Sequence, residues 1–278
     1  MKARSVDVVV ISDVHLGTYG AHARELNQYL RSVRPKMIIL NGDIIDIWQF
    51  KKRYWPKSHW ETIQLLLDYM QEGVRVIYLT GNHDDVLRRF SDYKIKNFQL
   101  LDKLVLKLDG KKAWIFHGDI FDLSVKYAPW LAKLGGKSYD YLIVLNRFIN
   151  AVLLRFGRER ISLSRRIKNS VKKAVKFVND YEEMAIDHAM SQGYDYVICG
   201  HIHQPCLREV KQQQRTLTYL NSGDWIENLT ALEYNNGAWS LFHYYDHFSA
   251  MAPVGQKEKK VDVATLFNTV EPPVEVAL

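Results

Sequence analysis

The sequence has few of the residues that would indicate an oxidising compartment or a membrane. Cys199 and Cys206 are the only cysteines among 278 residues. Cys199 lies in an apolar run typical of a buried strand, so we expect no disulfide framework. No segment reaches the roughly 18 uncharged apolar residues that a membrane-spanning helix needs. The first residues, 1–4, lead directly into an apolar run without the pattern of a secretory signal, and we therefore expect a cytoplasmic protein.

Positive charge is concentrated in one part of the chain. Residues 147–176 contain ten Lys or Arg and one acid, Glu159, whereas the whole chain carries a formal net charge of +7. The rest is therefore close to neutral. A hydrophobic content of 47% and a charged content of 25% are typical of a soluble globular protein with one large core. We predict one domain over residues 1–248, with a helical insert at about 121–192, and a polar C-terminal tail over 249–278.

Five apolar runs each end in residues that are suited to metal binding. The first run, Val8–Ile11, leads into Asp13 and His15, and in a continuing strand two such side chains would share a face. The other runs end in Gly42-Asp43, Gly81-Asn82-His83-Asp84, His117-Gly118-Asp119 and Gly200-His201-Ile202-His203. One such Asp is commonly a turn cap, and one such His is commonly structural. Five of them at strand ends indicate a site at the carboxyl edge of an α/β sheet.

The segments between these motifs predict further strands and helices. We expect helices over Ala23–Val33 and Asp85–Phe90, and a third over Trp60–Gln71 that is opened by a capping box from Ser58 to Glu61. Asp109-Gly110 predicts a hairpin turn between Leu100–Leu108 and Lys112–Phe116. Three late apolar runs favour a second sheet: Leu217–Asn221, Thr230–Tyr234 and Trp239–Tyr245.

The series Asp-x-His, Gly-Asp, Gly-Asn-His-Asp, His-Gly-Asp and Gly-His-x-His resembles the calcineurin-like metallophosphoesterase superfamily, and it runs from Asp13 to His203. Within that superfamily, Ser12–Gly17, Asn41–Trp48, Asn221–Trp225 and the long insert before Gly200 resemble the UDP-2,3-diacylglucosamine diphosphatase group of lipid A biosynthesis. The resemblance implies an α/β fold of two facing β-sheets flanked by helices (α/β/β/α), with the insert as a lid.

The resemblance also implies a pair of metal ions. Asp13, His15, Asp43 and His203 would hold the first ion, and Asp43, Asn82, His117 and His201 would hold the second, with Asp43 as the bridge. Seven ligands exceed the number that one typical transition-metal centre uses. Oxygen and nitrogen ligands without a thiolate suit Mn²⁺, with Fe or Zn²⁺ as alternatives.

Other residues near these motifs have expected roles in catalysis or support. His83 resembles the catalytic histidine of the superfamily, although many members of the lipid A group carry Arg there, and Asp84 is expected to orient it. We expect Asp46 and Trp48 to shape the pocket. We expect Asp119 and Asp122 to hold His117.

The expected reaction is hydrolysis of the pyrophosphate of UDP-2,3-diacylglucosamine to UMP and 2,3-diacylglucosamine 1-phosphate. Alternatives are a nucleotide pyrophosphatase, a phosphodiesterase or a nuclease of the same chemistry, and a non-catalytic scaffold. The insert, with its apolar stripe and basic residues, is expected to cover the acyl chains and to dock the protein peripherally on the inner membrane. No nucleic acid and no obligate protein partner are expected. The substrate-binding candidates in the insert are Arg165, Arg166, Lys168, Lys172 and Lys173.

Overall fold

The computed structural model describes residues 3–48, 54–120, 178–212 and 215–248. The chain divides into two units, Met1–Tyr244 and Tyr245–Leu278. Only the last residues of the short helix α5 (Tyr244–Phe248) are described in the second unit. Among the described residues, no helix has the length and apolar character needed to cross a membrane. The predicted domain boundaries stay a prediction.

The larger sheet of the first unit has seven strands in the order β12-β11-β1-β2-β3-β5-β4. Its central strands are parallel, and antiparallel strands pair at both sides of them. The centre is formed by β1 (Arg4–Ile11), β2 (Val33–Asn41), β3 (Arg75–Leu79) and β5 (Phe98–Leu101), and the antiparallel strands are β4 (Lys94–Ile95), β11 (Thr230–Asn235) and β12 (Ala238–His243).

The smaller sheet has five strands in the order β6-β7-β8-β10-β9. Its members are β6 (Lys103–Leu108), β7 (Lys111–Phe116), β8 (Tyr196–Cys199), β9 (Cys206–Gln212) and β10 (Arg215–Asn221). The predicted hairpin turn is confirmed, because Asp109 and Gly110 both have positive φ, 47° and 82°.

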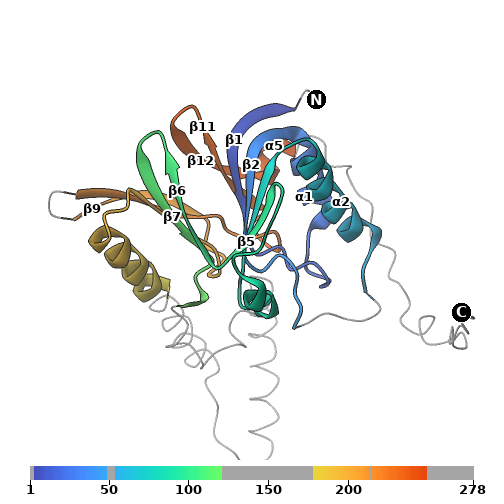
Figure 1. Ribbon diagram of the computed structural model, residues 1–278, viewed down its shortest axis with the longest axis horizontal. Helices are drawn as coiled ribbons and strands as arrows, with labels where there is room; N and C mark the ends of the chain where they lie inside the picture. Colours follow the sequence, from blue (N-terminus) through green and yellow to red (C-terminus); the bar gives the residue numbers. More distant parts are fainter. Residues whose placement is uncertain (1–2, 49–53, 121–177, 213–214, 249–278) are drawn as a thin grey trace, which may run out of the picture. The chain divides into compact units, whose positions relative to one another are not determined.

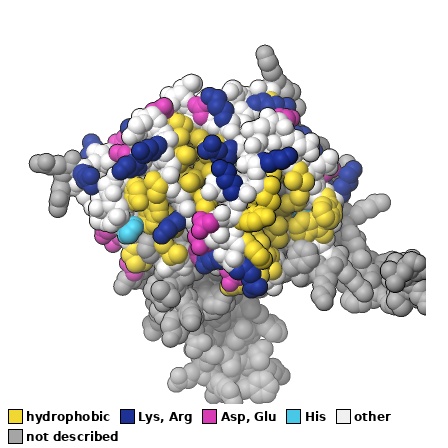
Figure 2. Space-filling model, in the orientation of Figure 1, with side chains coloured by type: hydrophobic (Ala, Val, Ile, Leu, Met, Phe, Trp, Pro, Cys, Tyr) yellow, Lys and Arg dark blue, Asp and Glu magenta, His cyan; other side chains and the backbone are white. Residues whose placement is uncertain are grey.

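Helices cover the outer face of each sheet (Figure 1). On one side lie α1 (Ala23–Ser32) and α2 (Lys57–Gln71), and on the other lies the helix over residues 178–191. A 3-10 helix, η1 (Asp85–Phe90), follows β3. Figure 2 shows hydrophobic side chains gathered over the α2 side, and Trp60 and Leu67 are exposed on that helix. The predicted α/β class with two facing sheets is confirmed.

The sheets pack on each other through apolar side chains that alternate along their strands. Val8, Val10, Ile39 and Ile77 from the larger sheet share one buried cluster with Ala113, Ile115, Ile198 and Leu220 from the smaller sheet. The neighbouring Val9 and Ile38 are buried as well, because the outer face of the larger sheet is covered. Strands that are buried on both faces explain why the sequence shows continuous apolar runs there.

Three local predictions were wrong. Leu100–Leu108 is not one strand, because the chain leaves the larger sheet at Leu101 and enters the smaller one at Lys103. The late runs do not form one second sheet, since β11 and β12 extend the larger sheet beside β1. Ser58 does not cap α2, which begins at Lys57 after Pro56 and has no side-chain cap. The Ser58 carbonyl instead accepts a hydrogen bond from Asn27 Nδ2 at 2.8 Å.

Replacing Ile39 by Ala should lower the free energy of unfolding by about 2–5 kcal/mol, because it leaves a cavity between the sheets. Ile39 is fully buried in the inter-sheet cluster. Leu67→Ala is the matched control, because Leu67 is exposed on α2, and it should change stability by less than about 0.5 kcal/mol. Urea denaturation measures the free energy of unfolding of both variants. Equal decreases in the two variants would contradict this location of the core.

Candidate metal centre

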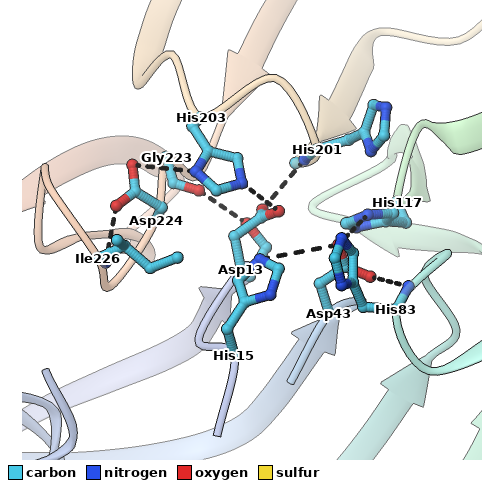
Figure 3. Close-up of polar contacts among 12 residues, drawn as sticks. Asp13, His15, Asp43, His83, His117, His201, His203, Gly223, Asp224 and Ile226 are labelled. Carbon is cyan, nitrogen blue, oxygen red and sulfur yellow. Dashed lines mark hydrogen bonds and ion pairs between the residues drawn. The ribbon is translucent and has the colours of Figure 1, made fainter. Parts of the chain in front are cut away.

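The predicted site residues follow the carboxyl ends of strands from both sheets. Asp13 and His15 follow β1, Asp43 follows β2, and Asn82 and His83 follow β3. From the smaller sheet, His117 follows β7, and His201 and His203 follow β8. Figure 3 shows the Asp13, Asp43, His117 and His203 side chains meeting between these strand ends. The structure therefore brings the two halves of the predicted set together.

The strand ends turn sharply, in contrast to the continuing strand expected at Asp13 and His15. Asp13, His15, Asp43, His201 and His203 all have positive φ, between 52° and 68°. This left-handed conformation costs a residue with a Cβ about 1–2 kcal/mol, so the surrounding structure must hold it. Strained backbone of this kind is concentrated at functional sites.

Two glycines allow the loops to approach each other closely. A Cβ on Gly42 would lie 2.3 Å from His117 Nδ1, and a Cβ on Gly81 would lie 2.2 Å from Asp43 Oδ1. Gly42 also has a φ of 81°, which a side chain would disfavour. The glycines before Asp43 and Asn82 are therefore part of the site's architecture.

The acids and histidines form adjoining groups whose ligand atoms lie within 4.8 Å of one another. One group is Asp13, His15 and His203, in which His203 Nε2 lies 3.2 Å from Asp13 Oδ1. A second is Asp43, His117 and His201, and a third is His15, Asp43 and His83. His117 Nε2 and His15 Nε2 lie 3.3 and 3.8 Å from the same atom, Asp43 Oδ2. Asp43 thus connects the groups.

The buried atoms without a hydrogen-bond partner of normal geometry include Asp13 Oδ1, His15 Nε2 and His117 Nε2 in these groups, and Oδ1 of Asn82, the residue before His83. Burying polar atoms without partners is costly, so they need an occupant. Oxygen and imidazole nitrogen atoms without a thiolate match a borderline or hard divalent cation. The residues present therefore fit divalent cations.

The electrostatics agree with this fit. Burial lowers the pKa of His117, but the Asp43 carboxylate raises it more, to about 10. Burial likewise lowers the pKa of His203, and the Asp13 carboxylate raises it to about 9. The buried carboxylates thus create a negative potential strong enough to retain protons on imidazoles. Divalent cations would satisfy the same potential, and their binding would release those protons.

The second ring nitrogens of two histidines are held by groups around the cluster, and that of a third lies near a carboxylate. His117 Nδ1 contacts the Asn41 carbonyl at 2.8 Å, and His15 Nδ1 contacts Asp46 Oδ2 at 3.1 Å. His203 Nδ1 lies 3.8 Å from Asp224 Oδ2. In His15 and His117, donation from Nδ1 leaves the Nε2 lone pair directed at the site, as metal-binding histidines require.

The prediction that Asp84 orients His83 was wrong. Asp84 accepts hydrogen bonds from the Gly81 and Ile44 backbone N–H groups, at 2.6 and 3.0 Å, and from the Tyr78 hydroxyl at 2.6 Å. It therefore fixes the loop instead of orienting His83. Asp46 takes the expected role, since its Oδ2 lies 3.0 Å from His83 Nδ1 as well as 3.1 Å from His15 Nδ1.

His117 also has a different partner from the predicted Asp119. Asp119 pairs with Arg88 at 2.5 Å, and the Asn41 carbonyl holds the His117 ring. A backbone carbonyl has no signature in a sequence, so this contact could not have been found there. Asp122 and the candidates Arg165, Arg166, Lys168, Lys172 and Lys173 lie outside the described residues.

Comparisons with known proteins agree with this geometry. The sequence model of the family described as calcineurin-like phosphoesterase matches residues 6–205. A UDP-2,3-diacylglucosamine hydrolase of Aliivibrio fischeri is 30% identical over 248 residues, which cover 84% of this chain and 97% of the relative. One of Vibrio cholerae is 27% identical, over 81% of this chain and 93% of its own length.

Solved structures of phosphoesterases are also similar. An archaeal phosphodiesterase has a TM-score of 0.42 and 13% identity, over 85% of this chain and 98% of its own. A phosphoesterase from E. coli has a TM-score of 0.42 and 12% identity, over 86% of this chain and 93% of its own. The family match covers most of the chain and contains the candidate metal centre, so the chain belongs to the calcineurin-like phosphoesterase family.

Proposed function

We propose that this phosphoesterase hydrolyses the pyrophosphate of UDP-2,3-diacylglucosamine to UMP and 2,3-diacylglucosamine 1-phosphate. The observation that carries the chemistry is the pair of ligand groups joined through Asp43. The relatives named UDP-2,3-diacylglucosamine hydrolase support the substrate, because they match along most of their length. Hydrolysis of the anhydride consumes one water and leaves a phosphate on each product.

The proposed ligands form two sets that share Asp43. Asp13, His15, Asp43 and His203 would hold one cation, and Asp43, Asn82, His117 and His201 would hold the other. When bound, such a pair polarises phosphoryl oxygens and lowers the pKa of a shared water. Mn²⁺ suits this set of oxygen and nitrogen ligands, with Fe or Zn²⁺ as alternatives.

His83 would act on the leaving oxygen. Burial lowers the pKa of His83, but the Asp46 and Asp43 carboxylates together raise it more, so this pKa lies above its ordinary value. With Nδ1 directed at Asp46, Nε2 can donate a hydrogen bond or a proton to the oxygen that leaves phosphorus. The backbone N–H of His83 donates to Asp43 Oδ1 at 2.8 Å, which keeps the ring beside the cluster.

We propose that the insert supports lipid handling and peripheral attachment to the inner membrane. This proposal rests on the sequence, in which the apolar stripe is followed by basic residues. A basic residue near an anionic leaflet contributes about 1 kcal/mol of attraction. The protein would therefore be cytoplasmic and bind the membrane reversibly.

A direct assay tests the substrate. Mn²⁺-loaded protein should hydrolyse UDP-2,3-diacylglucosamine, while single-stranded DNA and ordinary nucleotide pyrophosphates should be poor substrates. Asp43→Asn should abolish turnover, because an amide cannot bridge two cations with the charge of a carboxylate, and metal analysis should show fewer than two ions per chain. Turnover of DNA or nucleotides alone would reject the lipid substrate. Normal turnover by the variant would reject the bridge.

Asp46→Asn and Asp84→Asn distinguish a positioning residue from a residue that stabilises the loop. Asp46→Asn should lower kcat by about 10- to 100-fold with little change in Tm, because a neutral amide lacks the negative charge that orients both histidine rings. Asp84→Asn should lower stability by about 1–3 kcal/mol, since the loop donors lose their carboxylate. Its kcat per folded molecule should change less than that of Asp46→Asn, and the opposite pattern would restore Asp84 as the partner of His83.

Replacing Arg165, Arg166, Lys172 and Lys173 together by Ala should weaken sedimentation with anionic liposomes and raise KM for the lipid substrate. Hydrolysis of bis-p-nitrophenyl phosphate should stay nearly unchanged, because the proposed metal ligands lie elsewhere in the sequence. Replacing the exposed Lys103, Lys107, Lys111 and Lys112 provides a control with the same loss of charge. Equal losses on both substrates would show that the insert supports the metal centre instead.

A further inference from the structure

An exposed tryptophan stands next to the proposed catalytic histidine. Trp48 is 62% exposed, and its ring centroid lies 5.2 Å from that of His83 with an interplanar angle of 36°. Its indole Nε1–H donates to Asp85 Oδ1 at 3.3 Å. The loop after β2 and the loop after β3 therefore both hold this ring, which is oriented although most of its surface is free.

Trp48 is the outermost member of a row of rings that starts at the metal centre. The His203 and His15 centroids are 5.6 Å apart, and the His15 and His83 centroids are 4.6 Å apart. The next ring in the row is Trp48. A group that binds on Trp48 would thus lie one ring beyond the histidine that faces the leaving oxygen.

We propose that Trp48 is the stacking platform for the nucleobase of the substrate. This inference rests on the proposed function, in which the substrate carries a uracil one ribose away from the reacting phosphates. That separation matches a platform beside His83 and apart from the ligand atoms themselves. Stacking on an aromatic side chain needs no hydrogen-bond readout, because every base has a π-face.

The surroundings of Trp48 favour a base over an acyl chain. Its neighbours include the Asp85 carboxylate and the His83 imidazole, which are polar groups that a hydrocarbon chain would desolvate at a cost. A uracil presents polar edges to such groups while it covers the indole with an apolar face. A tryptophan already fixed by a hydrogen bond also loses little conformational entropy when a base binds.

Calorimetric titration of the Mn²⁺-loaded full chain with UMP and with ribose 5-phosphate tests the platform. The two ligands share the phosphate and the ribose, so the ratio of their Kd values isolates the base. Trp48→Ala should weaken UMP binding by about 5- to 150-fold, the range of base–aromatic stacking, and should change ribose 5-phosphate binding less than twofold. Trp48→Phe should keep most of the preference for UMP.

Trp60→Ala is the matched control. Trp60 is a tryptophan of similar exposure, 63%, but it lies on α2, where its ring packs against Trp55 at 5.8 Å. It should leave the ratio of Kd values unchanged. An unchanged ratio in Trp48→Ala would overturn the platform, as would a wild-type chain without preference for UMP. A raised KM for the lipid substrate with unchanged UMP binding would assign Trp48 to the lipid portion and overturn it as well.

The titration needs no turnover, so its result tests the platform independently of the proposed reaction. A chain that hydrolyses UDP-2,3-diacylglucosamine but gives the same ratio with Ala at position 48 rejects the platform and keeps the function. A chain that hydrolyses only other phosphoesters rejects the function, and the ratio then still reports whether Trp48 binds a base.

Discussion

The burial of two carboxylates side by side is the constraint on which this structure depends. Asp13 and Asp43 are almost fully buried. Burial raises the pKa of Asp43, His117 lowers it, and Asp13 raises it again, with a net value below the ordinary one. Backbone N–H groups support the ionised forms, from His201 to Asp13 Oδ2 at 3.0 Å and from His83 to Asp43 Oδ1 at 2.8 Å. Two like charges remain stable there because positive or donating groups surround both.

Neither sheet supplies that environment by itself. The larger sheet brings the carboxylates and His83, whereas the smaller sheet brings His117, His201 and His203. The inter-sheet core places these strand ends opposite each other, so its packing acts on the site. A substitution that shifts one sheet against the other would therefore alter the spacing of the ligand groups.

The sequence was informative where a feature is local. Apolar runs that end in Asp, Asn or His predicted residues that the structure brings together, and Asp109-Gly110 predicted its hairpin, because strand ends and tight turns depend on adjacent residues. Sheet membership was not predictable in this way. The runs that became β11 and β12 look like the run that became β10, and only pairing with β1 places them in the larger sheet.

The groups that hold the histidines of the site were the least predictable part. Asp46 and Asp84 are both acids near His83 in the motifs, and adjacency favoured Asp84. The structure selects Asp46, because the turn after β3 directs Asp84 towards the backbone N–H groups of Gly81 and Ile44. Which of two acids faces a ring depends on the direction of a turn, and no spacing rule specifies that direction.

The close approach at Gly42 and Gly81 has a consequence for assembly. The space beside Gly42 is filled by His117 from the other sheet, and the space beside Gly81 is filled by Asp43. Asp13 accepts a hydrogen bond from the backbone N–H of His201, which lies 188 positions away in the sequence. Contacts between such distant segments form late and slowly in folding. Two of the three ligand groups combine residues from both sheets, so tight metal uptake would report that both sheets have docked.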